Sequence, residues 1–473
     1  KQNVNSNVTL TADATFAHNL QSGDGNDQRE FWFKGTVDNA GYALTLYARN
    51  RWMYFTGKVT GAGKVTFESY NGYAYFRNGA NDFTSVLDIF TTGSGRVYLD
   101  EGGALTACPH INVWTNASLY LGGTGQDLPD DGVSTFGRLL NDTSVDLYSG
   151  TTFSLIGKNA SATVERMGVL RLKDGLVTVK SEDRDGSTCT LIVASLERDA
   201  AARPIALVRS DENNRASHKY NLGSGSYIKL ADGGASLTQI GGDGSRGTNK
   251  AVVPYLFSRT EPTESNDGRY GASSLIYCDA TNGLTQMLPA DFVNATTTAF
   301  PAVHADGNDN VRLPFSAAKP GKNTNQTLTL AGDTVINSLV VYNDQTGLGS
   351  DGGRLTLAGD VTLTVKSGAM LFGCNEESAR WAATLDVTTL NFGSAEGVIA
   401  CFEPHYGGLT INSAITGSGG LTIYANRTGT EGIVQLAGDN SGLSGQITIN
   451  AGDVQARHVR ALGGGTSTVY LGP

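Results

Sequence analysis

Three pairs of aspartates come closest, by residue type and spacing, to a site that could do chemistry. Enzymes that cut acidic polysaccharides need clustered carboxylates, as acid and base or as Ca²⁺ ligands, with Arg or Lys nearby. The stretch "HADGNDN" alternates oxygen ligands like a calcium loop but lacks the glutamate that closes an EF-hand. Turn aspartates that cap backbone N–H groups explain each pair more simply. The pairs are Asp130 and Asp131, Asp183 and Asp185, and Asp306 and Asp309.

Other catalytic patterns are missing from the sequence. The histidines show no metal-binding spacing such as HExxH, and no GxSxG elbow marks a nucleophilic serine. GxGxxG occurs at 242–247 and 347–352, but neither copy precedes a helix that could receive a phosphate. The five cysteines are scattered and never spaced as CxxC, so we interpret them as buried thiols. We therefore predict no catalytic residue, no cofactor and no metal site.

Aromatic residues are concentrated in the N-terminal part, in "REFWFKG", "RNRWMYF" and "ESYNGYAYF". Aligned on successive strands and pointing outward, their rings would make a platform for sugar faces or for a partner protein. Alternation would equally place half of them in the core. The predicted binding face consists of Trp32, Trp52, Tyr54, Tyr73 and Tyr75.

Short strands are the elements that must position these residues. Runs such as "NVTLTADATF", "VLRLKDGLVTVKS" and "GRLTLAGDVTLTVKSGAMLF" alternate apolar and polar residues at period two. Gly, Asn or Asp separates most runs and supplies the positive φ that tight turns require. No run has a convincing helical period. The chain is therefore predicted to be all-β.

Two distant segments, Val59–Ile89 and Ile415–Ile449, share one pattern. Both begin with an apolar residue and Thr-Gly-x-Gly, and both later reach Gly-x-Asn, an apolar residue (Phe83 or Leu443) and a further strand. Repeats built of strands too short to bury a face alone indicate stacked coils. The pattern predicts a parallel β-helix with loop insertions. Tandem antiparallel β-sandwiches are the alternative, since they also give alternating strands.

The regularity of the pattern divides the chain into three segments. Residues 1–193 and 326–473 are predicted to form N-terminal and C-terminal β-helix coils. In 194–325 the charge density rises and the coils are predicted to carry long surface loops. Pro, Gly and Asn crowd into 304–326, which makes it the best internal boundary.

Charge and the two ends of the chain restrict its partners. A net charge of −10 without a basic run argues against a nucleic-acid partner. No stretch approaches roughly eighteen consecutive apolar residues, so no membrane span is predicted. Both ends are strand-like and neither resembles a cap, so we expect either a piece of a longer protein or end coils that pair head to tail with another copy. The predicted assembly interface is Val8, Leu10, Val469 and Leu471.

The C-terminal repeat "ITGSGGLTI…VQLAGDNSGLSGQITINAGDVQARHVRALGGG" resembles the autotransporter-associated β-strand repeat of secreted bacterial passenger proteins. The clear similarity covers 415–465, and a weaker one covers 35–89. This resemblance implies a right-handed parallel β-helix on a protein displayed on, or released from, the bacterial surface. The full pattern of the family ends in a membrane-embedded domain, which "STVYLGP" does not resemble.

Together these patterns lead us to expect a non-catalytic extracellular structural protein: a stalk, an adhesin or a filament subunit. Its expected partners are further copies of itself or surface glycans. The alternative is a carbohydrate-binding or polysaccharide-degrading β-helix protein with its site on the loops of 194–325. A cluster of Asp, Lys and Arg on adjacent coils would favour the enzyme, and an aromatic strip without such a cluster would favour binding.

Overall fold

The regular secondary structure in the part that the structure describes is almost entirely β-strand, with one short 3-10 turn, η2 (Pro289–Asp291). Two compact units divide it. The predicted middle segment, 194–325, contributes to both units, and two of the boundaries fall inside strands, β22 (Ile205–Arg209) and β28 (Gly283–Gln286). Unit 1 comprises Lys1–Asp199, Arg209–Ser236 and Ala280–Leu284, and unit 2 comprises Ala200–Val208, Leu237–Asp279 and Thr285–Pro473. The computed structural model describes residues 2–19, 30–122, 137–158, 161–184, 187–210, 221–258, 274–295, 299–315, 325–343, 353–374, 382–402, 408–425, 433–465 and 467–472.

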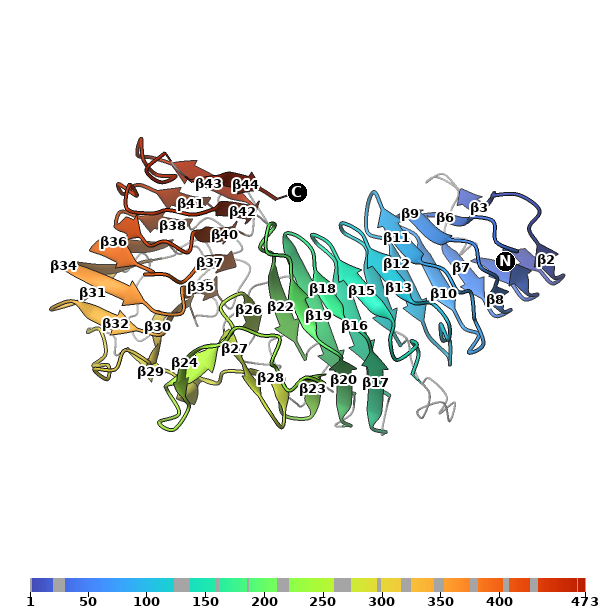
Figure 1. The fold of residues 1–473 in the computed structure, drawn as a ribbon, viewed down its shortest axis with the longest axis horizontal. Helices are drawn as coiled ribbons and strands as arrows, with labels where there is room; N and C mark the ends of the chain where they lie inside the picture. Colours follow the sequence, from blue (N-terminus) through green and yellow to red (C-terminus); the bar gives the residue numbers. More distant parts are fainter. Residues whose placement is uncertain are drawn as a thin grey trace. The chain divides into compact units, whose positions relative to one another are not determined.

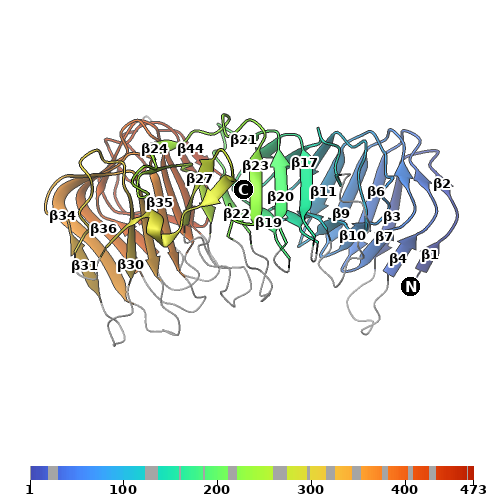
Figure 2. The ribbon, with the colours of Figure 1, turned by 90° about the horizontal axis from the view of Figure 1, so that it is seen from below.

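Unit 1 is a stack of coils in which successive coils add strands to two long parallel sheets (Figure 1, Figure 2). The first sheet contains β1 (Gln2–Val4), β4 (Glu30–Phe33), β7 (Trp52–Phe55), β10 (Tyr73–Phe76), β12 (Arg96–Leu99), β14 (Ser118–Leu121), β16 (Thr152–Ile156) and β19 (Leu176–Glu182). The second sheet contains β3 (Ala14–Asn19), β6 (Leu44–Arg49), β9 (Val65–Tyr70), β11 (Leu87–Thr91), β13 (His110–Val113), β15 (Ser144–Leu147), β18 (Leu170–Leu172) and β21 (Leu196–Arg198). Shorter parallel groups are β2 (Val8–Thr9), β5 (Val37–Asp38) and β8 (Val59–Thr60), and β17 (Thr163–Met167), β20 (Cys189–Val193) and β23 (Ser226–Leu230).

Unit 2 repeats this arrangement with its own parallel sheets. One contains β29 (Val293–Asn294), β30 (Asn310–Phe315), β33 (Ser338–Asn343), β35 (Ala369–Cys374), β37 (Gly397–Phe402), β40 (Leu421–Ala425), β42 (Ile447–Ala451) and β44 (Val469–Leu471). The other contains β31 (Gln326–Thr329), β34 (Arg354–Val365), β36 (Ala382–Asn391), β38 (Gly408–Ile411), β41 (Ile433–Leu436) and β43 (Asp453–Ala456), with β32 (Thr334–Ile336) and β39 (Ala414–Thr416) paired to it. Two antiparallel pairs accompany them: β24 (Ile240–Asp243) with β25 (Lys250–Val252), and β26 (Leu256–Ser258) with β27 (Ser274–Asp279).

The predicted β-helix is therefore confirmed as a β-solenoid, which makes about 14 turns in the described residues of the two units taken together. The alternative of antiparallel sandwiches is excluded, because most strand pairs in the described residues are parallel. Two parallel strands need a long connection between them. Here the rest of each coil connects a strand to its partner on the next coil.

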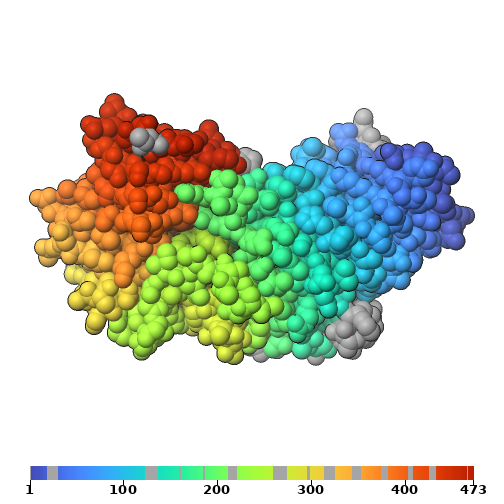
Figure 3. All heavy atoms as spheres, viewed as in Figure 1, coloured from blue at the N-terminus to red at the C-terminus, as the bar shows by residue number. Residues whose placement is uncertain are grey.

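Alternation along each strand fills the inside of the coils with apolar columns. In unit 1, Phe33, Phe55 and Phe76 stack with ring centroids 4.8 and 5.1 Å apart. In unit 2, buried Leu339 and Met370 are register partners in the same kind of column. The space-filling view shows the atoms of successive coils of unit 1 (blue to green) lying against one another (Figure 3). Residues between the inward positions must point outward, so each sheet also carries outward columns.

The Gly-x-Asn of the two aligned segments has the same contacts in each unit. Asn81 accepts the N–H of Val59 (2.9 Å) and donates to the carbonyl of Ala104 (3.0 Å). Asn440 accepts the N–H of Ile415 (2.7 Å) and donates to the carbonyl of Ala461 (2.7 Å). Both asparagines are fully buried. Each side chain thus links the backbones of two neighbouring coils, and we call this contact the asparagine staple.

Candidate functional site

Trp32, Tyr54 and Tyr75, three of the predicted aromatic residues, lie on one outward column of the first sheet of unit 1. Parallel register continues the column through Tyr98 and Tyr120. Successive ring centroids are 4.3, 4.7, 4.8 and 4.8 Å apart, and the rings are nearly parallel. These five rings are called the aromatic ladder below.

The aromatic ladder uses its ring faces for its own stacking. Tyr54 and Tyr75 each have a ring on both faces, so a sugar cannot lie flat on either. The guanidinium of Arg77 lies 4.6 Å from the Tyr54 centroid and is ion-paired with Asp100 at 3.1 Å. Burial, and then the charge of Glu30, raises the pKa of Tyr54 to about 12. This column therefore contributes stacking energy between coils and has little ring face to offer a ligand.

Trp52 and Tyr73 lie on the neighbouring outward column of the same sheet. Tyr73 packs edge-on against Tyr98, with centroids 6.1 Å apart, and Arg96 lies 5.3 Å from its ring centroid. Trp52 stacks on no aromatic residue of the described chain. All five predicted residues thus point outward, whereas Phe33 and Phe55, from the same aromatic stretches, lie in the core. Alternation therefore divides these aromatic residues between the two faces of the sheet, as expected.

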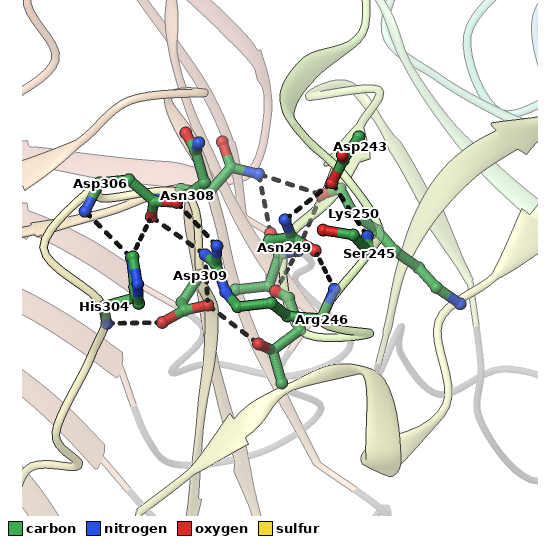
Figure 4. Close-up of polar contacts among 12 residues, drawn as sticks. Asp243, Ser245, Arg246, Asn249, Lys250, His304, Asp306, Asn308 and Asp309 are labelled. Atoms are coloured by element: carbon green, nitrogen blue, oxygen red, sulfur yellow. Dashed lines mark hydrogen bonds and ion pairs between the residues drawn. The ribbon is translucent and has the colours of Figure 1, made fainter.

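Asp306 and Asp309, the calcium-like pair, lie against the β24–β25 hairpin of unit 2 (Figure 4). Arg246, in the turn of the hairpin, donates to both carboxyl oxygens of Asp306, at 2.8 and 3.0 Å, and to Asp309 at 3.3 Å. The hydrogen bonds from Arg246 and from the N–H of Asn308 hold the pKa of Asp306 well below its usual range. A side-chain cation therefore lies where the sequence suggested a calcium ion.

The GxGxxG copy at 242–247 forms the turn of this hairpin. The N–H of Gly247 donates to the carbonyl of Gly244 at 2.8 Å, and both glycines have a φ of +76°. Such a backbone conformation favours glycine, so turn geometry accounts for the motif. The copy at 347–352 lies outside the described residues. Within the described ranges, no group of three or more His, Cys, Asp or Glu could hold a metal ion.

The remaining aspartate candidates are placed only in part. Asp183 is fully buried and accepts a hydrogen bond from Ser226 Oγ at 3.2 Å. Asp185, Asp130 and Asp131 lie outside the described residues.

The predicted assembly residues lie on or beside edge strands. Val8 is on β2, which pairs with β5, and Leu10 follows it and is buried. Val469 and Leu471 are on β44, which pairs with β42, and Leu471 is 70% exposed.

A mixed row of charged and amide side chains runs along the outside of the second sheet of unit 1, and the sequence pattern did not predict it. Register aligns one residue from each of five coils. Asn112 Nδ2 donates to Asp88 at 2.8 Å, and Arg171 donates to Asp146 at 3.3 Å and to Glu197 at 2.9 Å. The row, called the polar ladder below, consists of Asp88, Asn112, Asp146, Arg171 and Glu197.

Basic and aromatic neighbours complete the contacts of the polar ladder. Lys64 forms an ion pair with Asp88, which also accepts the indole N–H of Trp114 at 3.3 Å. His110 Nε2 lies 2.9 Å from the amide oxygen of Asn112. Burial would raise the pKa of Asp88, but the hydrogen bonds from Lys64, Asn112 and Trp114 outweigh it and hold the pKa below its usual range. Asp88 therefore stays ionised at neutral pH.

An aromatic row flanks the polar ladder, two residues further along each strand. Trp114 stacks between Phe90 and Tyr148, with ring centroids 5.2 and 4.1 Å apart. All three side chains are half-buried. The second sheet thus combines paired charges with an apolar border.

The polar ladder escapes sequence analysis because its members are distant in the chain. Asn112 is 24 residues from Asp88, and Arg171 is 25 residues from Asp146. The usable signal is a repeated triplet in which one polar residue stands between two inward apolar ones, as in Leu87–Ile89 and Ile111–Val113. Aligning those triplets coil by coil would have found the row.

Comparison with protein-family models, curated proteins and solved structures gives no match for this chain. Among the described residues, no helix has the length and apolar character needed to cross a membrane.

Proposed function

We propose that this chain is a non-catalytic structural protein of the bacterial surface or extracellular space, whose coils serve as a stalk or adhesin. The observation that carries the proposal is that side chains suited to chemistry are bonded to one another and hold the fold together. Asp306 and Asp309 bind Arg246, and Tyr54 stacks between Trp32 and Tyr75. The bacterial and extracellular parts of the proposal rest on the resemblance of 415–465 to passenger repeats.

Self-association is part of this proposal. Edge strands such as β1 and β44 pair on one side within the described residues. Coils of another copy, or of a longer polypeptide, would pair with such edges as coils pair inside each unit. Val8, Leu10, Val469 and Leu471 would then lie in the interface.

Electron microscopy at near-native concentration, with the chain mass checked by mass spectrometry, tests the assembly. Uniform filaments would support end-to-end pairing, and isolated short rods would contradict it. Incubation with acidic and neutral polysaccharides tests the absence of catalysis. Release of new reducing ends or unsaturated products, lost in a double Asp88→Asn, Asp146→Asn variant, would replace the structural proposal by a polysaccharide-degrading one.

Carbohydrate binding is the second candidate function, and the polar ladder is the observation that favours it. The ladder places Asp, Lys and Arg on adjacent coils, which is the pattern expected of an enzyme, and an aromatic row flanks it. Asp88 is held by Lys64, with a lowered pKa, and is therefore a weak general base. Paired, oriented polar groups suit hydroxyl recognition better than acid–base chemistry. Most of this face precedes 194–325, the segment whose loops were predicted to carry the site.

A further inference from the structure

The outward face of the second sheet in unit 1 is the described surface that best fits a ligand. Its buried carboxylates, Asp88 and Asp146, are 3% and 8% exposed, whereas the side chains that they hold reach solvent. Lys64 is 51% exposed and Arg171 is 32% exposed. By contrast, Tyr98, on the aromatic ladder of the first sheet, is 1% exposed.

We propose that the polar ladder and its aromatic row bind a neutral polysaccharide strand that lies along the coil stack. This inference rests on carbohydrate binding, the second function proposed above, and names its site and its class of ligand. The contacts, charges and spacing of the face support it, in that order.

The contacts show that the face is organised before a ligand arrives. Arg171 is fixed by Nε on Glu197 and by Nη1 on Asp146. Its Nη2 makes no hydrogen bond to a described residue and remains a donor for a ligand hydroxyl. Asn112 is fixed from both sides by Asp88 and His110. Groups that are already ordered lose little entropy on binding, which favours affinity.

The charges select a neutral ligand. The cations that contact the polar ladder or continue its aromatic row are paired with carboxylates: Lys64 with Asp88, Arg171 with Asp146 and Glu197, and Lys173 with Asp199. These pairs leave the polar ladder without an excess of positive charge to attract a polyanion, and the net charge of the whole chain is −10. A sugar hydroxyl both donates and accepts hydrogen bonds, so it suits a row in which donors and acceptors alternate.

The spacing suits a polymer. Parallel coils repeat about every 4.8 Å, close to the length of one sugar residue. A polysaccharide that runs along the stack can therefore place a residue against each coil. Phe90, Trp114 and Tyr148 form an apolar border for the C–H groups of the sugars; stacking occupies both faces of Trp114 and one face each of Phe90 and Tyr148.

Titration calorimetry of the full chain tests the proposal with laminarin, hydroxyethyl cellulose, mannan and chitin oligosaccharides as neutral probes, and with alginate and polygalacturonate as acidic ones. We expect at least one neutral probe to bind and the acidic probes not to bind. Arg171→Ala should weaken the neutral binding about tenfold or more, because it removes a charged donor. Glu197→Gln, at a 50% exposed side chain, should weaken it less without risk to folding.

Arg457→Ala is the matched control, because Arg457 is an exposed arginine of unit 2 whose guanidinium bonds only Gln455 among the described residues. It should leave the affinity unchanged within about twofold. Neutral binding that survives both Arg171→Ala and Glu197→Gln would overturn the site but not carbohydrate binding. Absence of binding to every probe would overturn both. Preference for acidic probes, or specific capture of a protein instead of a glycan, would also overturn the inference.

Discussion

Asn81 in unit 1 and Asn440 in unit 2 make the same asparagine staple, yet the outward columns of the two units are different. Unit 1 carries the aromatic ladder and the polar ladder. In unit 2, register aligns Thr327, Thr356 and Thr384 in an outward column. The same coil thus tolerates large rings, paired charges or small hydroxyls on its outside.

This difference separates two demands on the sequence. Inward positions must fill a column and satisfy buried backbone groups, so they repeat in both units. Outward positions meet solvent or a ligand, and only their neighbours on adjacent coils restrict them. A function that distinguishes the two units should therefore be sought on the outer faces.

Removing the asparagine staple should cause the largest loss of local stability, and the loss should occur in both units. Asn81→Leu and Asn440→Leu each leave a buried N–H and a buried carbonyl without a partner, at a cost of about 4 kcal/mol in local stability. Hydrogen exchange at the amides of Val59 and Ile415 measures it, and both should exchange faster. Asn412→Ala, which removes an exposed contact with Asp386, should leave both amides protected. Faster exchange in one unit alone would show that Asn81 and Asn440 do not have equivalent roles.

The pH dependence of stability should have opposite signs in the two units. Burial raises the pKa of Glu165 in unit 1 from 4.5 to about 7, although the N–H groups of Arg138 and Leu139 lower it. The folded state therefore holds this proton more tightly than the unfolded state. The free energy of unfolding of unit 1 should fall by about 3 kcal/mol as pH rises from 4.5 to 7, and then stay level.

Unit 2 should show the opposite dependence of stability on pH, and Glu165→Gln is the control for unit 1. The pKa values of Asp306 and Asp309 are lowered, so their contribution is complete above their ordinary pKa and is lost as pH falls below it. Urea unfolding followed by tryptophan fluorescence reports mainly unit 1, since Trp32, Trp52 and Trp114 belong to it. The free energy of unfolding should depend less on pH between 4.5 and 7 in Glu165→Gln. An unchanged dependence would mean that other groups cause it.

The sequence predicted the inner half of this molecule much better than the outer half. Alternation, turn glycines and Gly-x-Asn are local signals, so the coils, the repeats and the turn role of Asp306 could be predicted. The partner of Asp306 could not, because Arg246 is 60 residues away. The stacking of Tyr54 between Trp32 and Tyr75 depends on register, which alternation does not fix across loops of unequal length.

Removing one ring from the aromatic ladder should destabilise unit 1 more than removing one threonine hydroxyl from the outward column destabilises unit 2. Tyr75→Ala takes away two stacking contacts and a half-buried ring, which should cost about 2 kcal/mol. Thr356→Ala, on the outward column of unit 2, should stay within about 0.5 kcal/mol. Urea midpoints of the two variants measure this, and equal losses would show that the outer faces matter equally to stability.

Arg246→Gln should have the smallest effect, because both partners of its ion pair are about one-third exposed. We expect a small loss of stability at low salt and a smaller one at high salt, since exposed ion pairs are screened. Hydrogen exchange at Asn310, whose N–H donates to the carbonyl of Thr248 in the hairpin, measures it. A loss independent of salt would mean that Arg246 acts through packing. A return of protection when Ca²⁺ is added to the variant would show that the aspartates can hold the ion that the arginine replaces.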